Sequence, residues 1–270
     1  MFTNDTGNAE SRIKSHEVLF EHYRTIAYEG ANPFRPEQVV RDTDPSFGKL
    51  LPTNLDARIL DIGCGMGHFL HYLNLKGYRN LMGVELSPEQ VDFCQKTVNT
   101  NIVLISDLVA FLSERPQSWE CIIFKDVIEH LPRIQVIPTL SAIFQALTPG
   151  GTVIVETGNL ASPAGMFVRY IDFTHESGFT ENSLRQVLRA VGFSEITIRG
   201  NSPVIYSWRS YIRVAAQRTW HQCLRLMYSL DRGLSAAPKV LSPVLIGHAV
   251  RPRQTSGPSV AVEAPQIRKT

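Results

Sequence analysis

Three glycines at alternate positions follow an acidic residue at the end of an apolar run in this 270-residue chain. Gly63, Gly65 and Gly67 come directly after the run that contains Asp61. Glycine lets the backbone take positive φ and approach a bound molecule closely, and the residues from His68 onward have the pattern of a helix. The segment therefore predicts a strand, a tight loop that contacts a ligand, and a helix.

The position of Asp61 restricts the charge of that ligand. A loop that binds a pyrophosphate usually has the spacing G-x-G-x-x-G and offers backbone N–H groups to the anion. Here the spacing is G-x-G-x-G behind a carboxylate, which would repel a pyrophosphate and suit the ammonium and sulfonium of S-adenosylmethionine. Glu85 ends the next apolar run, where a carboxylate can accept both hydroxyls of a ribose. An NAD-dependent dehydrogenase is thereby disfavoured.

Short β-rich runs alternate with helical runs from residue 57 onward, and these elements must position the loop. Strands are predicted near 58–62, 80–85, 101–105, 119–125 and 151–157. Such alternation predicts a parallel sheet with right-handed crossovers and helices on both faces. The ligand is then expected at the carboxyl ends of the strands, where the strand order switches.

Five motifs in a fixed order give the chain a resemblance to a known family. They are Ile59–Gly67, Gly83–Pro88, Ile105–Leu108, Ile122–Pro132 and Leu147–Val155. Over about residues 55 to 200, the sequence resembles the class I S-adenosylmethionine-dependent methyltransferases. The resemblance implies a Rossmann-like, doubly wound α/β fold with a seven-stranded, mostly parallel sheet and an antiparallel last strand. It also implies methyl transfer with S-adenosyl-L-methionine as the cofactor.

The resemblance assigns residues to the parts of that cofactor. The implied contacts are Asp61, Gly63, Cys64, Gly65 and Gly67 for the amino-acid end, Glu85 for the ribose, Leu86, Asp107 and Leu108 for the adenine, and Lys125 at the pocket rim. Asp107 follows a strand end, so its carboxylate can accept the adenine amino group while Leu86 and Leu108 enclose the ring. Taken alone, Glu85 or Asp107 can equally be a helix N-cap.

Methyl transfer to a hydroxyl needs a base, whereas an amine acceptor needs only to be neutral. A stretch after the fifth predicted strand, with Asp172 and His175, resembles a D-x-T-H pattern of methyltransferases associated with cell-surface glycan and lipopolysaccharide gene sets. His175, oriented by a carboxylate, is the predicted base for a sugar hydroxyl. Asp172 and His130 complete the candidate catalytic set, and Arg169 and Tyr23 are candidate acceptor contacts. Alternatively, His175 caps a helix or bonds a backbone carbonyl.

A stretch after the fourth strand resembles a second group of methyltransferases. Asp126, Glu129 and His130 form a D-x-x-E-H arrangement that is similar to E-x-x-E-H in ubiquinone-biosynthesis O-methyltransferases, where such residues are associated with a divalent metal. Aspartate at the first position is one methylene shorter, which weakens the case for Mg²⁺. We therefore expect these residues to shape the pocket without a bound metal.

The rest of the chain is expected to form appendages on this core. The predicted parts are a helical cap or lid at 1–50, the cofactor-binding core at 51–202, a helical insertion at 203–240, the last core strand at 241–250 and a disordered tail at 251–270. The cap has one helix over about 13–27 and then a turn-rich passage with Pro33, Pro36 and Pro45. In the core, Thr180 and Gly192 are a natural N-cap and C′ residue of one helix.

Basic and aromatic residues concentrate in the insertion. Residues 203–270 carry ten Lys and Arg against two Asp and Glu, although the net charge of the whole chain is only +2. A helical wheel predicts a basic amphipathic helix in two pieces with a bend near residue 216. Such a helix can contact an anionic membrane peripherally or can be a lid with a solvated basic face. Nucleic acid is the less expected partner, because no N-P-P-[YFW] tetrapeptide is present.

Composition is ordinary for a soluble globular protein, with 43% hydrophobic and 19% charged residues. The N-terminal residues lack a signal-peptide pattern, and no window reaches the roughly 18 apolar residues of a spanning helix. We expect a cytoplasmic protein, with peripheral contact at the inner face of the membrane as a further hypothesis. The four cysteines form no C-x-x-C pair and are expected to be reduced and buried: Cys64, Cys94, Cys121 and Cys223.

The leading hypothesis is an O-methyltransferase that acts on a small molecule, a sugar or a lipid-linked glycan. A quinone-type or other metabolite O-methyltransferase is the alternative within the same class. A scaffold that binds the cofactor without catalysis is an alternative of a different class. The presence of Asp61, Glu85 and the three glycines argues against the scaffold, because a non-binding relative need not keep them.

Overall fold

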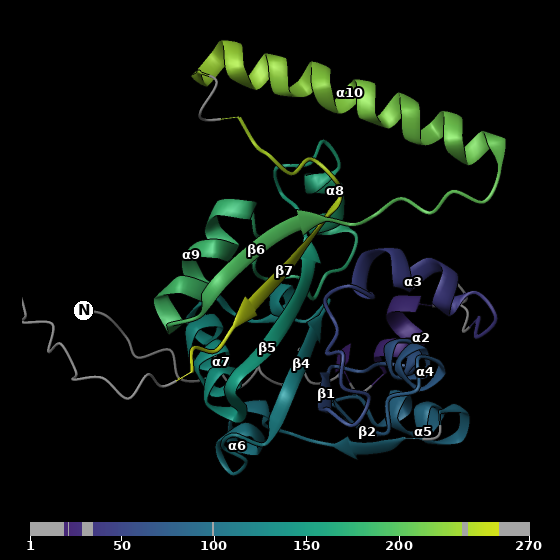
Figure 1. Cartoon of the computed structure of the whole chain (residues 1–270), viewed down its shortest axis with the longest axis vertical. Helices are drawn as coiled ribbons and strands as arrows, with labels where there is room; N and C mark the ends of the chain where they lie inside the picture. Colours follow the sequence, from purple (N-terminus) through teal and green to yellow (C-terminus); the bar gives the residue numbers. More distant parts are fainter. Residues whose placement is uncertain (1–18, 21, 29–34, 99, 234–236, 254–270) are drawn as a thin grey trace, which may run out of the picture.

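The computed structural model describes residues 19–20, 22–28, 35–98, 100–233 and 237–253 (Figure 1). Within them, seven strands form one sheet in the order β3-β2-β1-β4-β5-β7-β6. The strands are β1 (Arg58–Ile62), β2 (Asn80–Glu85), β3 (Asn101–Leu104), β4 (Trp119–Lys125), β5 (Leu147–Gly158), β6 (Ser194–Gly200) and β7 (Val244–Val250). β7 runs antiparallel to β5 and β6, and the other paired strands are parallel. The predicted Rossmann-like sheet with an antiparallel last strand is therefore confirmed.

Helices cover both faces of the sheet (Figure 1). One layer consists of α6 (Leu108–Ser113), α7 (Arg133–Ala146) and α9 (Glu181–Val191), and the other of α3 (Val39–Phe47), α4 (His68–Leu75) and α5 (Pro88–Thr97). Strand side chains alternate between the layers: in β1, Leu60 and Ile62 join the first and Ile59 joins the second. Because both faces are covered, the central strands carry long apolar runs.

The direction of strand addition reverses between β1 and β4. From β1 the chain moves outward through β2 to β3, and it then returns to β4 on the other side of β1. Ligands of doubly wound sheets bind beyond the carboxyl ends of the strands at such a point. Gly63 follows β1 and Asp126 follows β4, so these two loops border the expected site.

The core elements lie close to their predicted positions. The strands predicted at 58–62, 80–85 and 119–125 coincide with β1, β2 and β4. Thr180 caps α9 by accepting a hydrogen bond from the N–H of Ser183, and Gly192 ends the helix with a φ of 110°. The division of the chain into cap, core, insertion and tail stays a prediction.

Three short helices line the carboxyl edge of the sheet. They are α2 (Tyr23–Tyr28), the 3₁₀ helix η1 (Ile128–His130) and α8 (Gly165–Tyr170). Residues 13–18 and 21 of the predicted helix over 13–27, and Pro33 in the passage behind it, lie outside the described residues. That passage, predicted to be turn-rich, contains the helix α3 with Pro45 inside it. Burial of Val39 and Phe47 against the neighbouring layer stabilises this helix despite the proline.

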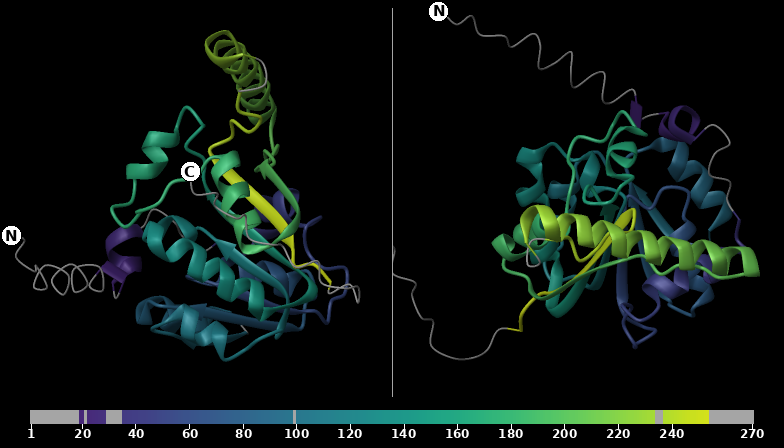
Figure 2. Two further views of the ribbon diagram at one scale, coloured as in Figure 1. Left: turned by 90° about the vertical axis from the view of Figure 1, so that its left-hand side faces the viewer. Right: turned by 90° about the horizontal axis from the view of Figure 1, so that it is seen from above.

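A long helix connects β6 to β7. α10 spans Trp208–Arg232 as one continuous helix, so the predicted bend near residue 216 is wrong. Its N-cap, Ser207, accepts the N–H of Ser210, and no glycine or proline interrupts it. Figures 1 and 2 show α10 lying across the carboxyl edge of the sheet, away from the body of the molecule. Among the described residues, no helix is both long and apolar enough to cross a membrane.

Arg251 is held against the core, so the prediction of a disordered tail is wrong at this residue. Its Nη1 donates to the backbone carbonyls of Phe144 at 3.0 Å and Leu147 at 2.5 Å. Its backbone N–H also bonds the carbonyl of Gly151. Carbonyls at the C-terminal end of a helix attract a cation, and here they anchor Arg251 beside α7. Residues 254–270 of the predicted tail lie outside the described residues.

Candidate cofactor and acceptor site

The loop after β1 has the conformation that its glycines allow. Gly63, Gly65 and Gly67 have positive φ values of 67°, 54° and 81°. The N–H groups of Gly63 and Cys64 donate to the carbonyl of Val84, which ties the loop to β2. Gly67 is the N-cap of α4, so the loop presents the N-terminal N–H groups of that helix at the carboxyl edge of the sheet.

Gly67→Ala is expected to destabilise this loop. A Cβ at Gly67 would lie 2.5 Å from Sγ of Cys94 and 2.6 Å from Cγ2 of Val98. We expect the free energy of unfolding in urea to fall by about 1–3 kcal/mol. Gly192→Ala is the matched control, because Gly192 is also left-handed, with a φ of 110° and a ψ of 7°, but among the described residues a Cβ there would meet only Phe144, at 3.6 Å. Equal losses in the two variants would contradict the close-contact explanation.

Asp61 is a buried carboxyl group within β1. It is 2% exposed, and its Oδ2 has no hydrogen-bond partner among the described residues. Burial raises the pKa of Asp61 to about 8, while Lys125 opposes the rise and Glu85 adds to it. An orphaned buried carboxyl oxygen is costly, so this position calls for a cationic or N–H group from a ligand.

The carboxylate of Glu85 is fixed at the end of β2. Its Oε2 accepts the N–H of Gly65 at 2.9 Å, and its Oε1 accepts those of Leu86 at 2.7 Å and Ser87 at 3.0 Å. Burial raises the pKa of Glu85, and these N–H groups work against the rise. Since a carboxylate has about four acceptor positions, roughly one stays available here. Accepting both hydroxyls of a ribose, as predicted, requires one of these N–H groups to change partner.

The predicted adenine contacts surround the start of α6. Asp107 is the N-cap of α6 and accepts the N–H of Ala110 at 3.0 Å, which is its alternative structural role. Leu86 is 44% exposed, whereas Leu108 packs partly on the core. The contacts of Asp107, Leu86 and Leu108 with an adenine ring stay predictions.

Three of the four cysteines are buried as expected, and Cys223 is exposed on α10. The prediction is wrong for Cys223 because its side of α10 does not face the core. The side chain of Cys64 lies in an apolar cluster with Cys94 and Ile102. The backbone N–H of Cys64 donates to the carbonyl of Val84. The predicted cofactor contact of Cys64 is therefore supported by its position in the loop and not by a free N–H group or an exposed side chain.

Acidic side chains surround Lys125 where β4 ends. Its ammonium pairs with Asp126 and lies 3.6 Å from Oε1 of Glu156. Burial alone would lower the pKa of Lys125, but the acids outweigh burial and raise it. Glu129 and Glu156 are buried, each with an Oε2 that lacks a partner among the described residues, and burial raises the pKa of both. Sequence analysis missed Glu156, although it is the single acid in the apolar run of β5.

The predicted catalytic residues meet beside η1 and the loop after α8. The hydroxyl of Thr174 lies 2.8 Å from Nδ1 of His130 and 2.7 Å from Oδ1 of Asp172. Tyr23 of α2 donates its O–H to Oδ2 of Asp172 at 2.6 Å. The ring centroids of His130 and His175 are 4.8 Å apart. The structure therefore brings these residues together from three separate parts of the chain.

The hydrogen bonds determine which nitrogen carries the proton on each imidazole. The carbonyl of Val168 can only accept, so Nδ1 of His175, 3.0 Å away, must donate. Partial burial would raise the pKa of Asp172, but two donated hydroxyls outweigh it and hold the pKa below its usual value. Thr174 thus donates to an ionised Asp172 and accepts from Nδ1 of His130. Each ring then has its lone pair on Nε2.

His130 is poorly suited to accept a proton. Burial, together with the adjacent imidazole of His175, lowers the pKa of His130 to about 4. A group with so low a pKa is neutral near pH 7 and is a weak base. His130 is therefore better suited to hold the network together, and His175 stays the candidate base by its position.

The guanidinium of Arg169 braces the loop that carries His175. It donates to the backbone carbonyls of His175 and, at 3.0 Å, Glu176. The N–H groups of Glu176 and Ser177 donate in turn to the carbonyl of Glu129, which joins this loop to η1. These contacts make Arg169 structural, and its predicted contact with the acceptor stays a prediction.

A single set of three metal-ligating side chains converges within the described part of the chain. It consists of His130, Asp172 and His175, whose ligand atoms lie within 4.8 Å of one another. Asp126 and Glu129 of the D-x-x-E-H stretch do not belong to it. The Mg²⁺ alternative that combined them with His130 therefore has no support from the geometry.

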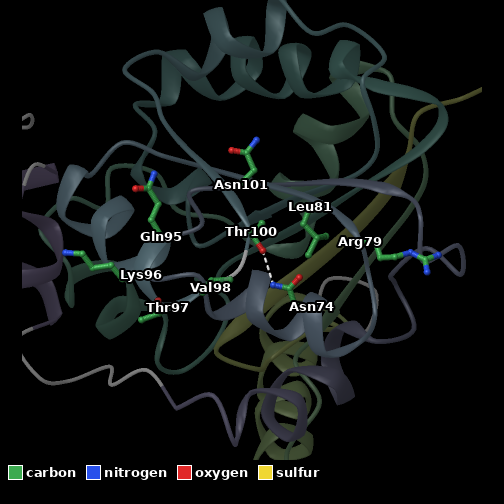
Figure 3. Close-up of a pocket in the computed structure, with 9 residues that line it drawn as sticks. All are labelled: Asn74, Arg79, Leu81, Gln95, Lys96, Thr97, Val98, Thr100 and Asn101. Carbon is green, nitrogen blue, oxygen red and sulfur yellow. Dashed lines mark hydrogen bonds between the residues drawn. The ribbon is translucent and has the colours of Figure 1, made fainter.

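Two of the cavities formed by the described residues adjoin the sheet. The larger, of about 620 Å³, lies at the amino ends of β2 and β3 (Figure 3). There Nδ2 of Asn74 donates to Oγ1 of Thr100 at 2.9 Å, beside Arg79 and Asn101. This cavity is on the edge opposite the glycine loop, so it is not a candidate for the cofactor.

The second cavity, of about 520 Å³, lies between α3, α10 and the carboxyl ends of β4 and β5. Lys125 and Glu156 line it from the sheet, and Arg213, Arg218 and His221 line it from α10. The candidate base His175 does not line it. At the carboxyl edge, the cavity beneath α10 and the candidate base His175 are therefore separate features.

Comparison with known families agrees with this site. A model of the methyltransferase-domain family matches residues 34–198, which is more than half of the chain. An uncharacterized protein of Haemophilus influenzae (strain ATCC 51907 / DSM 11121 / KW20 / Rd) is 26% identical over 154 residues, or 54% of this chain. The match spans 58% of that relative's length.

Solved structures show the same fold. A S-adenosylmethionine-dependent methyltransferase of Archaeoglobus fulgidus superposes with a TM-score of 0.58 at 21% identity, over 86% of this chain and 98% of that one. Phosphoethanolamine N-methyltransferase 2 of Haemonchus contortus, in complex with S-adenosyl-L-methionine, gives a TM-score of 0.56 at 17% identity, over 88% and 60% of the two chains.

The chain belongs to the methyltransferase-domain family, and it has the fold of S-adenosylmethionine-dependent methyltransferases. S-Adenosylmethionine is the ligand of the second of these solved structures. The residues present fit that molecule, because the orphaned Oδ2 of Asp61 suits the ammonium of its amino-acid end. The resemblance noted in the sequence is confirmed at the level of the methyltransferase-domain family and its fold.

Proposed function

We propose that the chain is an O-methyltransferase that acts on a hydroxyl of a small molecule, with a sugar or lipid-linked saccharide as the acceptor class. The observation that carries the proposal is the network around His175. Nδ1 of His175 donates to the carbonyl of Val168, which leaves Nε2 as a fixed lone pair beside His130 and Asp172. An amine acceptor needs no such base.

In this proposal, Asp61 and Glu85 hold the amino-acid end and the ribose of S-adenosylmethionine, which supplies the methyl group when bound. Nε2 of His175 accepts the proton of the acceptor hydroxyl. Asp172 fixes Thr174, and Thr174 fixes the ring of His130 against that of His175. Positioning of the reacting groups then supplies much of the rate. We place the reaction in the cytoplasm.

The proposal is tested with the full-length protein, S-adenosylmethionine labelled on its methyl group, and four acceptor pools. The pools are free sugars and sugar nucleotides, lipid-linked saccharides, quinols, and primary amines. Label in a base-stable ether on a saccharide supports the proposal. Transfer to quinols alone favours the quinone-type alternative, and transfer to amines alone overturns O-methylation. Cofactor binding without transfer to any pool favours a scaffold.

A further inference from the structure

The side of α10 that faces away from the body is apolar. Trp208, Ile212, Leu226 and Leu230 recur at spacings that place them on one stripe, and they are 68%, 56%, 62% and 78% exposed. Cys223 belongs to the same stripe and is also exposed. A helix on the surface of a globular protein normally turns its apolar side toward the core. α10 therefore has an apolar surface that the rest of the described chain does not cover.

The opposite side of α10 faces the body and is mostly polar. Ser210 and Val214 are its buried residues, at 4% and 3% exposed. Further along, Gln217 and His221 are half-buried and line the 520 Å³ cavity. The outward orientation of the apolar stripe is thus set by these contacts, and by the connections to β6 and β7 at its ends (Figure 2).

The charged residues of α10 indicate what kind of partner its apolar stripe binds. The helix contains five arginines and a single acid, Asp231; the arginines are Arg209, Arg213, Arg218, Arg225 and Arg232. Arg209 borders the stripe beside Trp208, and Arg213 and Arg218 lie on the two flanks of α10, nearer to the cavity that they line. All three are exposed, and such long cationic side chains can reach phosphate groups. Trp208, with Tyr211 and Trp220 at the stripe's borders, adds the residues enriched where a membrane meets water. Apolar, aromatic and basic groups in this order complement an anionic lipid surface.

A second apolar surface lies at the same end of the molecule. On α8 and the residues after it, Met166, Phe167, Tyr170, Ile171 and Phe173 are between 65% and 89% exposed. The two views of Figure 2 both place α8 beyond the carboxyl edge of the sheet, on the side where α10 lies. Exposed apolar groups that gather in this way mark an interaction surface rather than isolated surface residues.

We propose that α10 and the α8 segment dock on an anionic lipid bilayer, with α10 lying in the plane of the headgroups. The apolar stripe enters the boundary between headgroups and acyl chains, and the exposed side chains of Arg209, Arg213 and Arg218 reach lipid phosphates. Docking places the 520 Å³ cavity directly behind α10, next to the bilayer. The lipid surface is proposed independently of O-methylation, because it is recognised by α10 whether or not methyl transfer occurs.

The proposal is tested by sedimentation of the full-length protein with vesicles, without any acceptor or cofactor. We expect binding to vesicles that contain phosphatidylglycerol, at least about 10-fold weaker binding to pure phosphatidylcholine, and weakening as salt is raised. The double variant Leu226→Asp with Leu230→Asp should reduce partitioning at least about 10-fold, because two anchoring groups become anionic.

The matched control is the double variant Leu55→Asp with Leu75→Asp. Leu55 and Leu75 are 42% and 55% exposed, and they lie toward the amino ends of the strands, away from α10. This control should bind vesicles like the parent, and circular dichroism should show both variants folded. Absence of parent binding, or equal loss in both double variants, overturns the proposal.

A second copy of the chain is the competing occupant of the stripe. Analytical ultracentrifugation of the same proteins separates the two cases. Lipid docking is overturned if the parent is a dimer that does not bind vesicles and the double variant Leu226→Asp with Leu230→Asp is a monomer. Because neither measurement reads methyl transfer, their outcome is distinguishable from failure of the proposed O-methyltransferase activity.

Discussion

Asp61→Asn is expected to weaken binding of S-adenosylmethionine by about 10- to 150-fold, the loss of one hydrogen bond to a charged group. Oδ2 of Asp61 has no partner among the described residues, so a ligand ammonium is the group that completes it. The substitution also removes a carboxyl group whose ionised form is disfavoured by burial. The free variant should therefore melt at or above the temperature of the parent, while losing the thermal shift caused by the cofactor.

Calorimetric titration and thermal melts measure both effects. Asp92→Asn is the matched control, since Asp92 is exposed and pairs with Lys96 at the surface. The control should bind the cofactor like the parent. Parental affinity in Asp61→Asn would contradict the assignment of Asp61 to the cofactor's cationic end.

The pKa of Asp61 predicts a pH dependence of the same affinity. Burial raises the pKa of Asp61 to about 8, so the free protein holds this carboxyl protonated near pH 6. A cationic partner favours the ionised form, and affinity should rise about 10-fold between about pH 6 and 7.5. Above that range the ligand's own α-amino group starts to lose its proton. The Asp61→Asn variant should lack the rise.

The stability of the free protein should change in the opposite direction. The folded-state pKa of Asp61 is raised above its usual value, so the folded state holds the proton longer than the unfolded chain does. The contribution of this group to stability is therefore greatest at low pH and is lost as the pH rises through about 8. Urea titrations from low pH to about pH 8 give the free energy of unfolding of the parent and of Asp61→Asn. The difference between the two proteins at each pH measures the contribution of Asp61.

His175→Asn is expected to lower turnover by about 10²- to 10⁴-fold, the usual contribution of a general base. An asparagine amide can still donate to the carbonyl of Val168, as Nδ1 of His175 does at 3.0 Å, but it offers no basic nitrogen in place of Nε2. Cofactor affinity and melting temperature should therefore stay at their parental values. Single-turnover kinetics on a saccharide acceptor separates the chemical step from binding.

Two comparisons make this prediction specific. His175→Gln loses the bond to Val168 as well as the base, so any additional loss of stability in it measures the structural part. A chelator should leave the turnover of the parent unchanged. If the chelator lowers turnover and added metal restores it, His130, Asp172 and His175 are metal ligands instead. Parental turnover in His175→Asn removes His175 as the base.

Sequence patterns predicted the central elements well because their signals are local. The apolar runs of β1, β2 and β4 and the caps at Thr180 and Gly192 depend on neighbouring residues, and the structure has them in place. α3 was missed because tertiary burial of Val39 and Phe47 outweighs the local effect of Pro45. Arg251 was misplaced for a similar reason, since its carbonyl partners are about a hundred residues away in sequence.

In the candidate site too, local features could be predicted from the sequence and long-range contacts could not. The loop at Gly63–Gly67 could be predicted because φ above zero has a strong residue preference, whereas the partners of Glu85 could not. The link from Tyr23 to Asp172 spans 149 positions, and no periodicity or spacing encodes it. Equally, the wheel of α10 predicted an amphipathic helix but not which side faces the body.

The register of β6 and β7 shows that α10 is inserted between two strand ends that already adjoin. Gly200, the last residue of β6, is the register partner of Leu245 near the start of β7, so the two strand ends adjoin. A tight turn could join them directly, and the antiparallel hairpin would keep its pairing without the intervening residues. A chain of this fold could therefore gain or lose such a helix while its catalytic half stays unchanged. A change confined to one hairpin would then add or remove a surface-binding helix in a protein of this fold.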